Sequence, residues 1–218
     1  NYPPDWNDLI NKPSVFPPDY TNYPPSVKDL EKKYIWDDFN DNRLIERLSL
    51  FQRYRPEWTI GGTVVAENGY MAIKSIHGYG YIDSKFTVGT WKYKYRIPSS
   101  GGRHGMFIMA KKQWDSQNKP YPSYLFVVYG SEVDFYYYDG SSLTALLTYS
   151  VSTRDGNWHT VEITRDSAGN FEIILDGTSI GTVTDTNLTE SEIIEFWQDS
   201  DTAGGDDEVD LDDLEVFA

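Results

Sequence analysis

The 218-residue sequence contains no cysteine, so it can form no disulfide and offers no thiol for metal binding or nucleophilic catalysis. It also lacks an apolar run of the roughly 20 residues that a membrane-spanning helix needs. Basic residues are scarce, with 19 Lys and Arg against 34 Asp and Glu and a formal net charge of −15. That charge repels nucleic acids and anionic membranes. Neutral sugars, cationic surfaces and calcium are the partners that remain compatible with this composition.

Histidine is rare as well, with three residues at His77, His104 and His159. Their wide spacing, without cysteine, does not fit a zinc site. His77 and His104 stand beside glycines, which predicts loops. Trp158 follows an Asp-Gly turn, and we expect it to cap a core. His159 is expected to begin a strand and form local hydrogen bonds rather than act as a catalytic base.

Aromatic residues are abundant and supply what the missing disulfides do not. Hydrophobic residues make up 39% of the chain and aromatics 16%, with 17 Tyr, 10 Phe and 7 Trp. This composition predicts a sizeable core rather than disorder. The aromatics outside that core would form a binding surface, because Tyr and Trp combine an apolar ring with a hydrogen-bonding group.

Residues 1–33 differ from the rest of the chain. Aromatic-Pro-Pro triplets occur at 2–4, 16–18 and 23–25. Proline removes backbone donors and holds the preceding residue in extended geometry, which excludes a long helix or a central strand. The segment is predicted to be an extended arm or linker. It could be a flexible tether, or it could dock its aromatics on its own domain or on a neighbouring subunit.

From residue 34 to residue 218, short β-strands separated by turn residues are predicted. About eleven strands without a long helix between them indicate one all-β domain, a two-sheet antiparallel sandwich. Residues 44–51 and 189–194 are the two stretches that could form short helices. The expected strands are 70–76, 91–97, 106–109, 124–129, 133–138, 146–151, 159–165, 171–176, 178–183, 193–198 and 209–217.

Two local patterns are especially informative. Trp91, Tyr93 and Tyr95 alternate with Lys92 and Lys94, which predicts a strand with one buried face and one charged face. The strand expected at 171–176 is followed by Gly177 and a second strand at 178–183, a typical hairpin signal.

Three segments together resemble the concanavalin-like, laminin-G-like jelly-roll superfamily. The first comprises residues 36–41 (WDDFND), Trp58 and residues 68–70. The second comprises residues 155–159 (DGNWH), Arg165 and residues 175–177, and the third is 209–217 at the end of the chain. The resemblance covers residues 34–218 and implies a two-sheet antiparallel jelly roll whose first and last strands are neighbours. It says little about the ligand, because one fold hosts many functions.

The arm carries a second resemblance. Residues 6–13 (WNDLINKP) with 16–18 (FPP) are similar to short segments of tail-fibre and surface-adhesion proteins. This similarity implies an arm that joins a filament or virion shaft to a receptor-binding domain. It also implies an extracellular, cell-surface or virion-surface location and a homo-oligomer formed through the arm. A Pro-rich linker of chance similarity is the alternative.

Acidic residues gather near both ends of the predicted domain, at 37–41 and 206–213. Jelly rolls of the resembling superfamily often carry a calcium ion between the first and last strands, and hard oxygen ligands suit Ca²⁺. On that basis Asp38 and Asp212 are the predicted ligands of a structural calcium ion. Strand alternation would place Asp213 on the face of Val209 and Leu211. The alternative is a solvated acidic edge that prevents edge-to-edge aggregation.

A glycoside hydrolase or polysaccharide lyase on the same fold is the enzymatic alternative. Glu132 and Asp134 resemble part of the Glu-x-Asp-x-x-Glu signature of jelly-roll glucanases, and glycosidases use two carboxylates. The third acid is missing, because residues 136–138 are all Tyr. No organised set of lyase residues is recognisable.

A non-catalytic glycan- or receptor-binding module therefore fits the sequence best, with a polysaccharide or cell-surface glycan as partner. Aromatic rings stack on sugar faces while Asp, Asn and Gln bond hydroxyl groups. Candidate platforms also include Tyr79, Tyr81 and Trp197. A structural subunit of an extracellular filament stays open as another alternative. The predicted ligand-binding residues are Trp114, Asp115, Gln117, Asn118, Tyr121, Tyr124, Tyr136 and Tyr138.

Overall fold

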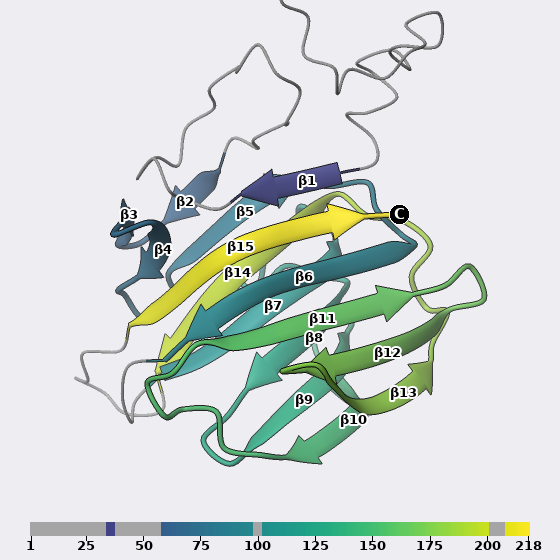
Figure 1. The fold of residues 1–218 in the computed structure, drawn as a ribbon. Helices are drawn as coiled ribbons and strands as arrows, with labels where there is room; N and C mark the ends of the chain where they lie inside the picture. Colours follow the sequence, from purple (N-terminus) through teal and green to yellow (C-terminus); the bar gives the residue numbers. More distant parts are fainter. Residues whose placement is uncertain (1–33, 38–57, 98–101, 201–207) are drawn as a thin grey trace, which may run out of the picture.

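The computed structural model describes residues 34–37, 58–97, 102–200 and 208–218. The predicted arm at 1–33 and the possible helix at 44–51 lie outside these residues. Within them the chain forms two antiparallel β-sheets stacked face to face (Figure 1), which confirms the two-sheet jelly roll. The prediction of a second short helix, at 189–194, is wrong, since residues 189–192 are irregular and a strand begins at Ile193. No helix of the described residues is long and apolar enough to cross a membrane.

The first sheet has eight strands and lies at the front of Figure 1, with β6 and β15 at its centre. Its order is β13-β12-β11-β6-β15-β4-β3, and β1 also pairs with β15. The strands are β1 (Tyr34–Asp37), β3 (Val64–Glu67), β4 (Tyr70–Ile73), β6 (Gly89–Arg96), β11 (His159–Arg165), β12 (Asn170–Leu175), β13 (Thr178–Thr184) and β15 (Val209–Phe217).

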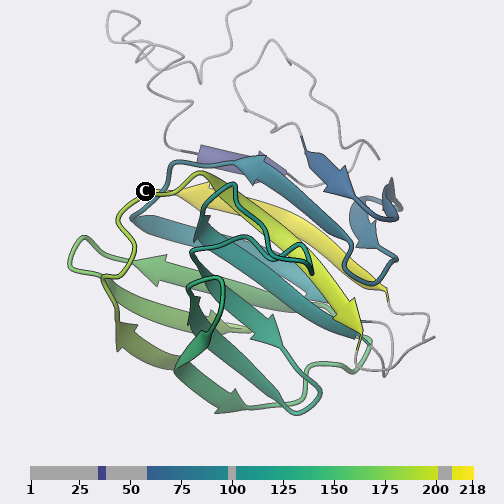
Figure 2. The same ribbon diagram turned by 180° about the vertical axis from the view of Figure 1, so that it is seen from behind.

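The second sheet has seven strands in the order β10-β9-β8-β7-β14-β5-β2 and faces the viewer in Figure 2. The strands are β2 (Thr59–Gly61), β5 (Tyr79–Asp83), β7 (Gly102–Ala110), β8 (Ser123–Val128), β9 (Glu132–Tyr138), β10 (Leu143–Ser150) and β14 (Ile193–Ser200).

The first and last strands of the described domain are neighbours, as the sequence predicts. β1 pairs antiparallel with the end of β15, from Tyr34 opposite Phe217 to Asp37 opposite Leu214. β4 pairs with the beginning of β15 on the same side. The two ends of the jelly roll therefore meet in the middle of the first sheet.

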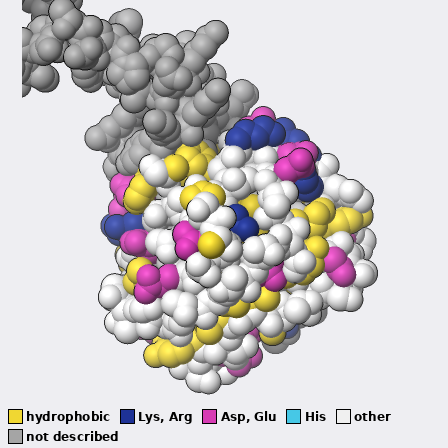
Figure 3. All heavy atoms as spheres, turned by 90° about the vertical axis from the view of Figure 1, so that its right-hand side faces the viewer, with side chains coloured by type: hydrophobic (Ala, Val, Ile, Leu, Met, Phe, Trp, Pro, Cys, Tyr) yellow, Lys and Arg dark blue, Asp and Glu magenta, His cyan; other side chains and the backbone are white. Residues whose placement is uncertain are grey.

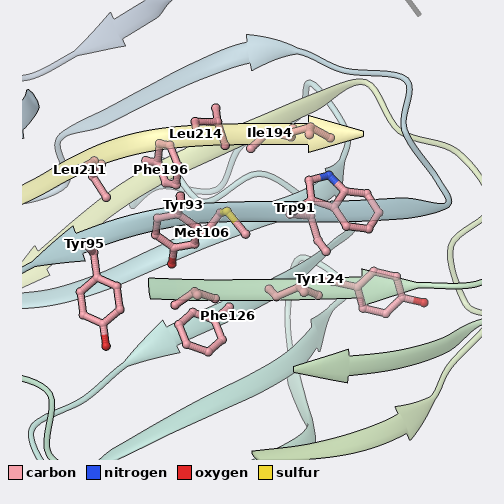
Figure 4. Packing of buried hydrophobic residues seen from close by; sticks show 14 of the residues in the cluster. Trp91, Tyr93, Tyr95, Met106, Tyr124, Phe126, Ile194, Phe196, Leu211 and Leu214 are labelled. Atoms are coloured by element: carbon pink, nitrogen blue, oxygen red, sulfur yellow. The ribbon is translucent and has the colours of Figure 1, made fainter. Parts of the chain in front are cut away.

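The core between the sheets follows the alternation read in the sequence. Trp91, Tyr93 and Tyr95 of β6 are buried, while the lysines between them are half-exposed. In Figure 4 the Tyr93 ring lies beside Phe196 of β14, and their ring centroids are 4.9 Å apart. Burial of one such side chain contributes about 1.5–3 kcal/mol, so this strand is a principal anchor of the fold.

The predicted hairpin is confirmed. β12 pairs with β13, and Asp176 and Gly177 connect them with φ values of 50° and 76°. A two-residue turn with two positive φ angles matches the twist of the strands that it joins. Asp176 also accepts a backbone hydrogen bond from Thr160 at 2.8 Å, which ties the turn to β11.

Candidate ligand-binding site

A second apolar cluster lies on the face of the seven-stranded sheet that points away from the core. It contains buried residues of β7, β8, β9 and β14, including Phe107, Leu125 and Val127, and is separate from the core between the sheets. We call its Tyr and Trp members the aromatic face. They are Tyr79, Tyr81, Trp114, Tyr121, Tyr129, Tyr136, Tyr138 and Trp197.

The rings of the aromatic face contact one another across strands. Tyr79 and Tyr81 of β5 stack with ring centroids 6.3 Å apart, and Trp114 lies 5.4 Å from Tyr81. Tyr121 meets Tyr138 edge to face at 6.1 Å. Most of these rings are half-exposed, whereas Tyr138 and Trp197 are buried. The face therefore combines a rigid floor with accessible aromatic surface.

The segment 111–122, between β7 and β8, crosses this face, and Figure 2 shows it in front of the sheet. Asp115 accepts a hydrogen bond of 2.7 Å from the Tyr138 hydroxyl through one oxygen. Its other oxygen accepts from the backbone N–H groups of Gln117 at 2.7 Å and Lys119 at 2.9 Å. The Trp197 indole donates to the Gln117 carbonyl at 3.0 Å. These bonds hold the loop on the sheet in one arrangement.

The structure brings most of the predicted ligand-binding residues to this one face. Trp114, Asp115, Gln117 and Asn118 come from the loop, where Gln117 is exposed. The Asn118 side chain donates to the His77 carbonyl at 3.3 Å. The remaining members are Tyr121, whose hydroxyl accepts from Gln113 at 2.7 Å, and Tyr136 and Tyr138, which lie on β9.

Tyr124 is placed elsewhere. Its ring has no exposed surface and lies in the core between the sheets, stacked on Phe135 at 5.8 Å and edge to face with Phe171 at 4.8 Å. Its hydroxyl donates to Asp185 at 2.5 Å. Because β8 alternates its side chains, Tyr124 points to the core while Leu125 points to the aromatic face. We therefore leave Tyr124 out of the candidate site.

The sequence did not single out Glu195 and Tyr129. Glu195 of β14 has no exposed surface, and its Oε2 accepts a hydrogen bond of 2.8 Å from the Trp114 indole. Burial raises the pKa of Glu195 to about 9; the Trp114 bond opposes this shift and the Asp115 charge adds to it. The alternation of Ile193, Glu195 and Trp197 is the signal that places Glu195 on this face.

The carboxylates of the hydrolase alternative also lie on this face. Glu132 and Asp134 point to the same side of β9, and the Tyr136 hydroxyl donates to Asp134 at 2.7 Å. Asp134 is buried, and its Oδ1 has no partner among the described residues. Glu195 lies three strands away from β9. At about 4.8 Å per strand this separation is about 14 Å, beyond the roughly 5–9.5 Å that glycosidase carboxylates span.

The predicted calcium ligands are only partly described. Asp38 lies outside the described residues. Asp212 sits at a β-bulge, where its Oδ1 accepts from the Asp213 N–H at 2.8 Å. Within the described ranges no three His, Asp or Glu side chains gather closely enough to hold a metal ion. The calcium site stays a prediction.

The bulge shows that the face predicted for Asp213 is wrong. Asp213 has a φ of 50° and pairs with Lys94 at 2.5 Å instead of facing the core with Val209 and Leu211. The extra residue shifts the alternation, so Leu214 and Val216 continue the buried row.

No family model and no curated protein matches the sequence. Among solved structures, the Emp47p carbohydrate recognition domain aligns with a TM-score of 0.64 and 11% identity over 85% of this chain and 95% of its own. The carbohydrate binding module CBM66 from Bacillus subtilis gives 0.58 and 14% over 73% and 94%. Bacillus licheniformis β-glucanase gives 0.58 and 12% over 85% and 98%. At these identities the similarity shows the fold alone, and it confirms the concanavalin-like jelly roll.

Proposed function

We propose that this protein binds a glycan on the aromatic face and does not turn it over. The observation that supports this proposal is the gathering of eight Tyr and Trp side chains from separate segments on one face of the seven-stranded sheet. A half-exposed aromatic surface offers rings on which the C–H faces of a sugar can stack. We also propose an extracellular, cell-surface or virion-surface location, because such a glycan would be met there.

Polar groups around the rings would orient the sugar. Gln117 is exposed at the rim, and Asp115 and Asn118 are half-exposed beside it. Asp115 and Asn118 are already held by hydrogen bonds within the protein, so little side-chain entropy is lost when a ligand binds. This arrangement favours a ligand with several hydroxyl groups over a purely apolar one.

The surface charge supports the same class of partner. On the face that Figure 3 shows, the acidic side chains are dispersed among hydrophobic and uncharged ones, and the basic side chains form small groups. A nucleic acid would need an extended basic surface. The names of the structural neighbours, a carbohydrate binding module and a carbohydrate recognition domain, are consistent with a glycan.

The test combines a glycan array with a reducing-sugar release assay on the same polysaccharides. We expect binding without release, and we expect Tyr81→Ala and Trp114→Ala to weaken binding at least tenfold. Tyr149→Ala is the matched control, because Tyr149 is a 38% exposed aromatic on the edge strand β10, outside the aromatic face. Equal loss in all three variants would contradict the proposed site.

A hydrolase is the second candidate. Glu132 and Asp134 on one face of β9 favour it, as does the similarity to the fold of a β-glucanase. Release of reducing sugar that disappears in Glu132→Gln would establish turnover. The Glu215→Gln variant, which changes a carboxylate on the other sheet, should leave such release unchanged.

The filament alternative gives a third outcome. Silence in both assays, together with fibres in electron micrographs, would favour a structural subunit joined through the arm at 1–33. The aromatic face would then be a contact between subunits.

A further inference from the structure

Trp158 lies on the opposite side of the molecule from the aromatic face. The sequence predicts that Trp158 caps the core, but the residue is 38% exposed and immediately precedes β11 of the eight-stranded sheet. Trp58, Trp91, Trp114 and Trp197 are all less exposed. Exposure of an apolar indole ring to water is unfavourable, so the residues around Trp158 indicate which role the exposed ring has.

Arg96 stacks on the Trp158 ring. The guanidinium carbon lies 4.9 Å from the centroid of Trp158 and 5.3 Å from that of Tyr70. The two rings meet edge to face at 5.8 Å. Arg96, at the end of β6, and Tyr70, at the start of β4, alternate with the buried residues Tyr95 and Met71. All three groups therefore project from the outer face of the eight-stranded sheet.

Asp210 lies beneath this cluster. It is fully buried on β15, opposite Arg96, and its Oδ2 accepts from Nε of Arg96 at 2.8 Å and Nη2 at 2.6 Å. Its Oδ1 has no hydrogen-bond partner among the described residues. The carboxyl group is aimed out of the sheet into the cluster, so it fixes the guanidinium under the aromatic rings.

A second carboxylate and a lysine complete the cluster. Glu208 is 29% exposed and lies 3.7 Å from Lys74 Nζ. Burial raises the pKa of Asp210 to about 6; Arg96 opposes the shift and the neighbouring Glu208 adds to it. Glu208 thus offers an acceptor next to the Asp210–Arg96 pair on which the indole stacks. Lys74 also pairs with Glu67, so Arg96 and Lys74 stand against three carboxylates and the cluster has no excess of positive charge.

We propose that Trp158, Arg96, Tyr70 and Glu208 form a second binding site, which takes a neutral sugar. The sugar ring would stack on the exposed part of Trp158, and its hydroxyls would bond Glu208 and the Arg96 N–H groups that Asp210 does not use. An arginine–carboxylate pair beside an aromatic platform suits vicinal hydroxyls, which both donate and accept. An anionic ligand is disfavoured by the carboxylates and by the net charge of −15.

This site does not depend on the proposed function of the aromatic face, because the two lie on opposite sheets. With both sites present, one chain would bind two glycan segments. Linked sugars on one surface would then be held with higher avidity than either site alone provides.

The experiment counts binding sites per chain. Calorimetric titrations of the full chain would use neutral oligosaccharides of three classes, a β-glucan, a galactan and a mannan. We expect two sugars per chain for the wild type and one for Trp158→Ala. Trp158→Phe keeps an aromatic platform and should restore the second site. Thermal unfolding of each variant checks that the fold is intact.

The outcomes separate this inference from the first proposal. An unchanged stoichiometry in Trp158→Ala overturns the second site. A loss of all binding in Trp114→Ala also overturns it and leaves the aromatic face as the glycan site. If Trp158→Ala loses all binding and Trp114→Ala binds like the wild type, the second site is supported and the first is overturned. No binding of any of the three sugars by the wild type overturns both for neutral glycans of these classes.

Discussion

The indole Nε1 of Trp114 donates a hydrogen bond of 2.8 Å to Oε2 of Glu195, whose side chain has no exposed surface. The bond joins the loop over the aromatic face to the middle of the sheet beneath it. Because burial raises the pKa of Glu195 to about 9, the carboxyl group is protonated at neutral pH. Loop and sheet are therefore joined without burying a net charge.

This relationship predicts a pH-dependent stability. The pKa of Glu195 rises from 4.5 to about 9 on folding, so its contribution is complete below pH 4.5 and is lost as pH rises through about 9. Glu195→Gln mimics the protonated acid and should not show this loss. We expect the two proteins to be similar at pH 4.5 and the variant to be more stable at pH 9, by a few kcal/mol at roughly 1.4 kcal/mol per pKa unit. Parallel urea-unfolding profiles over this range would contradict the assignment.

At His159, in contrast to Glu195, the charged form of the side chain is the one that the fold stabilises. Its Nδ1 lies 2.7 Å from Asp176 and its Nε2 3.1 Å from Asp155, so both carboxylates favour the imidazolium. Burial lowers the pKa of His159, but the hydrogen bonds to Asp176 and Asp155 outweigh it and raise the pKa above 6.5. The stabilisation is present below pH 6.5 and lost as pH rises through the folded-state pKa.

The corresponding variant is His159→Gln. It should be less stable than the wild type at pH 5.5 by about 1 kcal/mol, since charge-assisted hydrogen bonds are lost near the surface. At pH 9 the two proteins should differ less, because the wild-type imidazole is then neutral. Urea midpoints at the two pH values measure the difference, and a penalty that grows toward pH 9 would show that the charge is not the cause.

The fold was predictable where one face of a strand is buried and the other exposed. Trp91, Tyr93 and Tyr95 report the core side of β6 because Lys92 and Lys94 separate them. β8 gives no such signal, since Ser123–Val128 is buried at every position between the core and the aromatic face. A strand covered on both sides does not alternate in polarity, which is why Tyr124 could not be assigned to a face from sequence.

The sequence predicts which loop residues belong to the candidate site, but it does not predict their hydrogen-bond partners. The residues of the loop could be named because polar and aromatic residues are adjacent in sequence there. Glu195 accepts a hydrogen bond from Trp114, a residue 81 positions away, and no local pattern contains that contact. His104 shows the same limit: it lies on β7 rather than in the predicted loop, buried 3.0 Å from the Tyr93 hydroxyl. Burial lowers its pKa to about 3, so this histidine is neutral.

Calcium is tested by its removal. If Asp38 and Asp212 bind Ca²⁺, a chelator should lower the melting temperature and added Ca²⁺ should restore it, because an ion bound to the native state stabilises it by mass action. Asp212→Ala should abolish the response. Asp83→Ala is the control, since this 69% exposed carboxylate pairs with Lys112 on the other sheet. An unchanged melting temperature in metal-free buffer would contradict the calcium site.

Gly140 supports the aromatic face through its backbone. It has a φ of 100°, and a Cβ added to it would overlap the ring of Tyr121. Its carbonyl also accepts a hydrogen bond of 3.2 Å from the Tyr138 hydroxyl. Gly177 offers a matched comparison, since it has a φ of 76° but no atom within 4 Å of an added Cβ.

Comparison of the two glycine variants separates the cost of backbone strain from the effect of displacing the Tyr121 ring. Gly177→Ala should cost about 1–2 kcal/mol, the penalty of a left-handed conformation, and leave glycan binding unchanged. Gly140→Ala should cost about 1–3 kcal/mol more through overpacking and also weaken binding, because the Tyr121 ring must move to make room for the added Cβ. Urea unfolding and the glycan titration measure the two effects on the same samples. If Gly140→Ala loses stability but binds like the wild type, Tyr121 does not contribute to the ligand-binding surface.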